Sequence, residues 1–109
     1  MYNRLLRRVN VKDGTCILVE NNFFSGTIEN ISLGGVFVAS KIQLKVRDRV
    51  NMCMFLPIDS GGFEIDAVVV ATRVENRGIA LKYDYLAPKE LRKLKSYILR
   101  VDGPSRSTH

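Results

Sequence analysis

Tryptophan, cysteine and histidine are almost missing from this chain. Its 109 residues include no Trp, two Cys and one His, and that histidine is the final residue, His109. No other Cys or His lies near Cys16 or Cys53 at the spacing of metal ligands. A hydrolytic triad or a histidine-based metal site therefore lacks its residues. We predict no enzyme activity, no catalytic residue, no metal and no cofactor, and we interpret both cysteines as small buried hydrophobic residues.

Long apolar segments are also absent. No run of about 18 uncharged apolar residues exists, which excludes a transmembrane helix. Residues 1–10 carry three arginines where a signal peptide needs an apolar stretch, so we expect a cytoplasmic protein. The length favours one domain. A chain of this mass buries about two thirds of its surface on folding, which is enough for a core without disulfides or metals.

Acidic residues are scarce at both ends, where the positive charge is concentrated. The net charge is +6, and residues 1–12 hold four basic residues and no acid. Residues 13–88 hold seven basic and nine acidic residues, whereas residues 89–109 hold six basic and two acidic ones. A slightly acidic middle argues against a broad surface for a nucleic-acid polymer. A small anionic ligand at the N-terminal end therefore becomes competitive with a polymer.

Short β-type segments separated by turns follow the basic start. Between Val50 and Leu56 every second residue is apolar, which is the period of a strand with one face in a core. Residues 65–70 are almost continuously apolar and are predicted to be the most buried. Gly and Asn in segments 59–62 and 75–78 favour tight hairpins and antiparallel pairing. The predicted strands are 15–20, 25–30, 35–39, 49–56, 63–75 and 78–83.

One amphipathic helix is predicted at residues 88–101, starting at Pro88 and stopped by Gly103 and Pro104. Its apolar stripe is Leu91, Leu94, Ile98 and Val101. Its basic side chains are expected to face water: Lys89, Arg92, Lys93 and Arg100. The predicted fold is all-β with one C-terminal helix, a six-stranded antiparallel β-barrel capped by that helix. The domain spans 1–103, with residues 1–12 as a flexible arm and 104–109 as a disordered tail.

Two short polar groups could bind a ligand. Arg4 and Arg8 lie up to about 13 Å apart in an extended segment, so two guanidinium groups could hold one ligand from different sides. Arginine pairs in bidentate fashion with phosphate and with the O6 and N7 edge of guanine. Asn30 and Ser32 add short donors and acceptors, and the glycines after them allow close backbone approach. A ligand that contains both guanine and phosphate matches best.

These two groups, Arg-x-x-x-Arg-Val at residues 4–9 and Asn-x-Ser-x-x-Gly at residues 30–35, resemble the motifs of the PilZ domain family. The glycine, apolar strand and aromatic residue at 78–83 also resemble that family, and the likeness covers residues 2–101. It implies a split six-stranded barrel that binds the bacterial second messenger cyclic di-GMP. By position, the implied ligand-binding residues are Arg4, Arg8, Asn30, Ser32 and Gly35. Secondary candidates are Arg7 and Gly34.

Further expectations follow from these residues. An arginine-based site should reject cyclic di-AMP, because adenine presents a donor where guanine presents O6. Residues 1–10 are expected to be mobile without ligand and to fold over the bound nucleotide. Since no second domain is predicted, the output should be a changed surface offered to an unidentified partner protein. One bound dinucleotide and a stacked pair both remain open.

Two other functions compete with nucleotide sensing. A small basic barrel could bind single-stranded nucleic acid on stacked aromatic side chains. The aromatic candidates are Phe23, Phe24, Phe37 and Tyr83, most of which we interpret as core. A PilZ-like adaptor could also keep the motifs and act only through protein contacts. Arg73 could face the ligand as well, but the strand register that decides this does not follow from the sequence.

Overall fold

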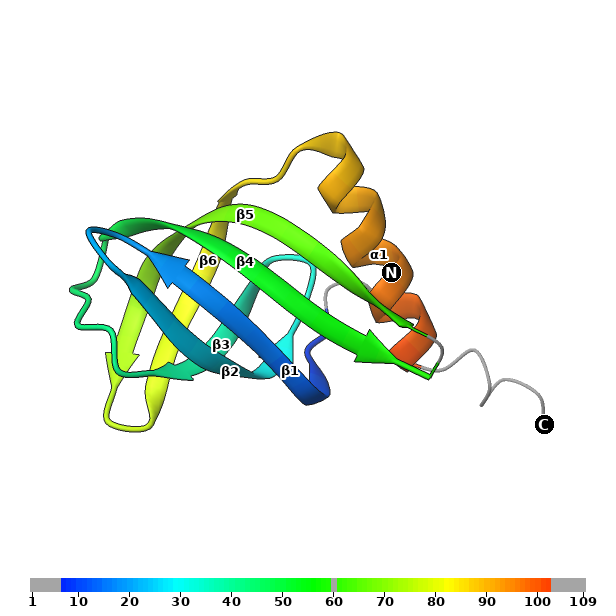
Figure 1. Cartoon of the computed structure of the whole chain (residues 1–109), viewed down its shortest axis with the longest axis horizontal. Helices are drawn as coiled ribbons and strands as arrows, with labels where there is room; N and C mark the ends of the chain where they lie inside the picture. The colour runs from blue at the N-terminus through cyan, green and yellow to red at the C-terminus, as the bar shows by residue number, and fades with distance from the viewer. Residues whose placement is uncertain (1–6, 60, 103–109) are drawn as a thin grey trace.

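The computed structural model describes residues 7–59 and 61–102 and shows a closed barrel with one helix beside it (Figure 1). Around the barrel the strands follow the order β1-β2-β3-β6-β5-β4, and all neighbours pair antiparallel. The elements are β1 (Val9–Val19), β2 (Phe23–Ile31), β3 (Gly35–Ser40), β4 (Arg49–Ile58), β5 (Gly61–Glu75), β6 (Gly78–Tyr85) and α1 (Pro88–Asp102). The predicted six-stranded antiparallel barrel with a C-terminal helix is confirmed.

The core lies inside the barrel and is built by the period-2 pattern of the strands. Every second residue from Val50 to Leu56 of β4 is buried, as predicted. Segment 65–70 of β5 was predicted to be the most buried, and this was wrong, because Gly35–Val38 of β3 is buried at every position and segment 65–70 is not. Val68 and Val70 are only half-buried, because in a single closed sheet each strand has one face inside and one face outside.

The first strand begins at Val9, six residues before the predicted start. Val9 pairs with Ile31 and is buried in the core, and Asn10 pairs with Asn30. The register then shifts before Gly14, where Asp13 has a φ of 61°. Asp13 and Gly14 therefore form an irregularity inside the strand. The predicted arm, residues 1–12, overlaps β1 by four residues.

Helix α1 packs against β5 and β1 at one end of the barrel (Figure 1). Leu94 and Ile98 are buried in the core as predicted. Val101 was expected beside them but is exposed, and Tyr97 is buried, with its ring edge-to-face against Phe63. Near its C-terminal end, the buried face of α1 therefore differs from the predicted one: Tyr97 is buried against Phe63 of β5, and Val101 points elsewhere.

A polar contact ties the start of α1 to β5. Lys93 was expected to face water, but it is half-buried, pairs with Glu90 and donates from Nζ to the Glu64 carbonyl at 2.8 Å. The Asp66 backbone N–H donates to Glu90 Oε1 at 3.0 Å. This bond is the main cause of a lowered pKa of the Glu90 carboxyl. The helix is thus held by hydrogen bonds as well as by apolar packing.

The two cysteines lie on opposite faces of the sheet. Cys16 is buried in the core as predicted, and burial raises the pKa of its thiol to about 12. Cys53 was predicted to be buried too, but it is only half-buried. Desolvation and a hydrogen bond with Asp66 raise the pKa of the Cys53 thiol to about 11. Both thiols are therefore protonated at neutral pH.

In the parts of the chain that are described, no helix combines the length and the apolar character needed to cross a lipid bilayer.

Candidate functional site

The turn between β2 and β3 is held by Ser32. Its Oγ accepts hydrogen bonds from the backbone N–H groups of Gly34 at 3.1 Å and Gly35 at 3.3 Å. The Ser32 backbone N–H donates to the Gly35 carbonyl at 2.9 Å. Ser32 is only 6% exposed. This serine therefore sets the shape of the turn, which is the usual local chemistry of a short hydroxyl side chain.

Gly35 occupies a position with no space for a side chain. A Cβ there would lie 2.4 Å from the Leu81 carbonyl oxygen of β6. At Gly34 the nearest atom to a Cβ would be Ser32 Oγ at 3.9 Å, so that glycine is exposed and sterically unconstrained. The Gly34 carbonyl accepts a hydrogen bond from the Tyr83 backbone N–H at 3.2 Å. The turn is thus fastened to β6 through both glycines.

Arg8 brings the two predicted motifs together. Its Nη1 donates to Asn30 Oδ1 at 2.9 Å and approaches the Gly35 carbonyl oxygen at 3.4 Å. The contact arises because β1 begins at the next residue, with Val9 opposite Ile31. Both bonds use Nη1, so the Nε and Nη2 donors of the guanidinium group take no part in them. The exposed arginine is thereby oriented over the turn with donor groups to spare.

Of the other arginine candidates, the structure describes Arg7 and Arg73. Arg4 lies outside the described residues. Arg7 is exposed and immediately precedes Arg8. Arg73 is exposed and paired with Glu75, and the register places it on the row that runs from Asn30 through Phe37 and Ala80. Arg73 is therefore three strands away from Asn30 along one row of the sheet.

Tyr83 contributes a feature that the sequence motifs did not indicate. Its ring packs against the core, and its hydroxyl is buried with no hydrogen-bond partner in the part of the chain that the structure describes. Burial raises the pKa of the Tyr83 phenol, and the nearby charge of Arg8 opposes this shift. Since the same residue donates its backbone N–H to Gly34, an unpartnered buried hydroxyl lies close to the candidate site.

The aromatic side chains do not form an open stacking platform. Phe37 is 3% exposed, with the Arg77 guanidinium 4.7 Å and the Arg73 guanidinium 6.0 Å from its ring centroid. Phe24 packs against the core, as Tyr83 does. Phe23 alone among these four predicted candidates is largely exposed. The expectation that most of them serve packing is confirmed.

Within residues 7–59 and 61–102, no three His, Cys, Asp or Glu side chains are grouped closely enough to hold a metal ion.

The fold and the turn together define a class: a small closed antiparallel β-barrel with a C-terminal helix and an arginine seated on an Asn-x-Ser-x-x-Gly turn. The chain belongs to the PilZ domain family, whose model matches residues 2–100. The resemblance inferred from the two motifs is confirmed. PilZ domains are in general non-enzymatic receptors for cyclic di-GMP.

Two solved structures share this fold. The structure of the Bacillus subtilis inhibitor of motility, MotI/DgrA, superposes with a TM-score of 0.80 at 18% identity, covering 97% of this chain and 54% of that one. The chain thus spans about half the length of that protein. The PilZ domain of CeSA from a cellulose-synthesizing bacterium gives a TM-score of 0.64 at 13% identity, covering 88% and 98% of the two chains. No curated protein matches this chain in sequence.

Proposed function

We propose that this protein is a cyclic di-GMP receptor that acts as a non-enzymatic adaptor in the cytoplasm. The observation that carries the proposal is the position of the Arg8 guanidinium, held on Asn30 Oδ1 and the Gly35 carbonyl. A guanidinium group oriented in this way can donate to a phosphate oxygen or to guanine O6 and N7. Membership of the PilZ family supports cyclic di-GMP, which carries both groups.

The candidate residues have different roles in this proposal. Arg8 and Arg4 supply the guanidinium donors, one from each side of the ligand. Asn30 orients Arg8 and offers its amide to the ligand. Ser32 and Gly35 act through the backbone, because the serine hydroxyl already accepts two backbone N–H groups and the glycine has no space for a side chain. Selectivity for guanine over adenine follows from the donor-only chemistry of arginine.

Signal output is proposed to use the segment before β1. This segment includes Arg4 and leads directly into Arg8, so a ligand held by both arginines would order it against the barrel. We expect amide hydrogen exchange of residues 2–8 to slow when cyclic di-GMP is added. Equal protection with and without the nucleotide would refute this conformational step while leaving binding itself intact.

Isothermal titration calorimetry with cyclic di-GMP tests binding. We expect a dissociation constant in the micromolar range or tighter for the wild type, and weakening by about tenfold to a hundredfold for Arg8→Ala, since hydrogen bonds to charged groups contribute about 1.5–3 kcal/mol. Arg92→Ala is the matched control, because Arg92 is exposed on α1. Cyclic di-AMP should give no heat.

Three results would overturn the proposal. Absence of heat from folded wild-type protein would leave an adaptor that works through protein contacts alone. Equal affinity of wild type and Arg8→Ala would remove the candidate site. Binding of single-stranded DNA with a steep salt dependence, in place of the dinucleotide, would favour a nucleic-acid barrel, since the slope scales with the number of phosphates contacted.

A further inference from the structure

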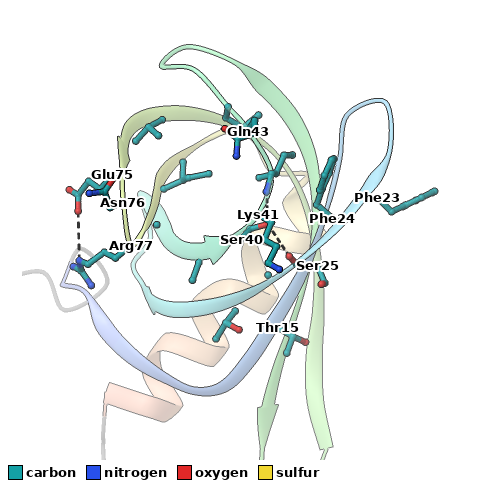
Figure 2. A pocket seen from close by; sticks show the side chains of 18 residues that line it. Thr15, Phe23, Phe24, Ser25, Ser40, Lys41, Gln43, Glu75, Asn76 and Arg77 are labelled. Atoms are coloured by element: carbon teal, nitrogen blue, oxygen red, sulfur yellow. Dashed lines mark hydrogen bonds and ion pairs between the residues drawn. The ribbon is translucent and has the colours of Figure 1, made fainter.

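A second concave surface lies at the barrel end away from α1. The β1–β2 turn, the β3–β4 connection and the β5–β6 turn all meet at this end (Figure 1). They surround a hollow of about 1120 Å³, seen from close by in Figure 2. Among the described residues of the candidate nucleotide site, Arg8, Asn30, Ser32 and Gly35 do not line it. This end of the barrel therefore offers a site separate from the Arg8 turn.

The rim of the hollow exposes large apolar side chains. Phe23 is 79% exposed, and Figure 2 shows its ring projecting away from the barrel at the start of β2. Val74 lines the hollow from β5 and is 44% exposed, and Val46 on the β3–β4 connection is 55% exposed. Grouped apolar exposure of this kind on a small protein is typical of a surface that another molecule covers.

The β3–β4 connection combines a buried face with a cationic one. Ile42 and Leu44 are buried and close the barrel, so the residues between and after them face outward. Lys41, Lys45 and Arg47 are exposed, and none of the three forms an ion pair with any residue that the structure describes. The β3–β4 connection therefore carries positive charge without an ion pair to a described residue, and Lys41 brings part of this charge to the wall of the hollow.

The opposite side of the hollow is electrostatically balanced. Arg77 lies across from the connection and pairs with both Glu29 and Glu75 (Figure 2). The uncompensated positive charge thus belongs to the β3–β4 connection, which indicates where the carboxylates of a bound partner would lie.

The connection is held rigidly. Arg47 has a φ of 84°, a left-handed conformation in which glycine is the least strained residue. Its backbone N–H donates to the Ala71 carbonyl at 2.7 Å, and the Ala71 N–H donates back to the Asp48 carbonyl at 2.9 Å. Asp48 Oδ2 also accepts the Lys45 N–H at 2.8 Å. A strained arginine that the surrounding structure keeps in place is more typical of a functional surface than of a loose loop.

We propose that the mouth surface, defined as Phe23, Lys41, Lys45, Val46, Arg47 and Val74, binds an acidic segment of the partner protein. Apolar side chains of that segment lie against Phe23 and against Val74, and its carboxylates pair with the cations of the β3–β4 connection. This inference rests on the proposed adaptor function, for which it supplies the output site. A second copy of the chain fits poorly, because a two-fold interface would bring the same cations face to face.

The two sites can be occupied together. β2 and β3 connect them: Asn30 pairs with Phe37 near the Arg8 turn, and Gly26 pairs with Ser40 beside the hollow. Along β3, Gly35 and Ser40 are five residues apart, which corresponds to about 16 Å of strand. A partner segment on the mouth surface therefore does not compete with a nucleotide, and the two strands provide a direct mechanical link between the sites.

Selection from a library of random 12-residue peptides displayed on phage, with the purified full chain as bait, tests this surface. We expect enrichment of peptides that combine Asp or Glu with a large apolar residue. The best peptide, synthesised and measured by fluorescence anisotropy, should bind about tenfold more weakly to Lys41→Glu/Arg47→Glu, because each exposed ion pair contributes a few tenths to about 1 kcal/mol. Phe23→Ser should also weaken binding by about tenfold. Arg92→Glu and Leu99→Ser, at exposed positions of α1, are the matched controls and should bind normally.

The inference is overturned if no peptide is enriched, if the enriched peptides are neutral or basic, or if they bind Phe23→Ser as well as the wild type. A dimer in sedimentation that Phe23→Ser dissolves would assign the surface to a second copy and also overturn it. Oligothymidine binding lost in the charge-reversal variant would do the same. Cyclic di-GMP titrations of these variants should match the wild type, so a failure of nucleotide binding and a failure of peptide binding are recorded separately.

Discussion

Removing the hydroxyl of Tyr83 should stabilise this protein. The oxygen is buried and has no hydrogen-bond partner among residues 7–59 and 61–102, so folding removes its water without supplying a hydrogen bond from these residues. The rest of the ring packs against the core. The substitution Tyr83→Phe keeps that packing and deletes only the unpartnered group, and for this reason we expect a gain in stability where most core substitutions cause a loss.

The size of the gain follows from the cost of burying a hydroxyl. Mutational data place this cost at about 1–3 kcal/mol when no hydrogen bond compensates it. For a domain of this size, 1 kcal/mol corresponds to roughly 4 °C in melting temperature, so we expect an increase of about 4–12 °C. Tyr85→Phe is the control: Tyr85 is exposed, its hydroxyl is available to water, and its removal should leave the melting temperature unchanged.

The same residue predicts a dependence on alkaline pH. Burial raises the pKa of Tyr83, so the folded protein keeps the phenol proton that the unfolded chain releases near pH 10. Stability therefore falls as the pH rises above 10, by up to about 1.4 kcal/mol per pH unit, and Tyr83→Phe lacks this contribution. Urea unfolding at pH 7 and at pH 10.5 measures both effects. A lower melting temperature for Tyr83→Phe at pH 7 would refute the reasoning, because it would mean that the hydroxyl is satisfied.

Three further substitutions test other parts of the structure. Gly35→Ala should cost about 3 kcal/mol in urea unfolding, since its Cβ would meet the Leu81 carbonyl at 2.4 Å, whereas Gly34→Ala should cost little. Because the pKa of Cys16 is raised to about 12, stability should begin to fall above pH 9; Cys16→Ala should show a shallower decline between pH 9 and 10 in the same assay. Glu90→Ala removes the acceptor of a β5 backbone N–H and should lower the free energy of unfolding by about 1 kcal/mol, and an unchanged denaturation midpoint would contradict this.

The barrel was predictable because the alternation of apolar and polar residues can be seen within each strand. The alternation from Val50 to Leu56 and the turn residues between strands determine which faces are buried and where the chain reverses. The start of β1 was not predictable in this way. Asp13 and Gly14 have the composition of a turn, and only pairing of Val9 with Ile31 shows that the strand continues through them. The buried face of helix α1 was also predicted only in part, since Tyr97 rather than Val101 is buried against the barrel.

Part of the candidate site could be read from the motifs, and part could not. Spacing identified Arg8, Asn30 and Gly35, and the structure brings those three together. Spacing did not separate their roles: it predicts Ser32 as a ligand contact, and the structure adds that the Ser32 hydroxyl oxygen accepts two backbone N–H groups of the turn. The unpartnered hydroxyl of Tyr83 had no signature in the sequence, because whether a tyrosine finds a partner depends on atoms brought close by other strands.

The mouth surface could not be predicted from the sequence either. Its residues lie between positions 23 and 74, and no motif joins them; closure of the barrel alone brings the three connections to one end. The sequence by itself determined the number and order of the strands, the helix and the two motifs that indicate the family, because each of these patterns is local. The tertiary structure alone decided which polar groups are satisfied and which charges are left unpaired, because those outcomes depend on contacts between distant segments.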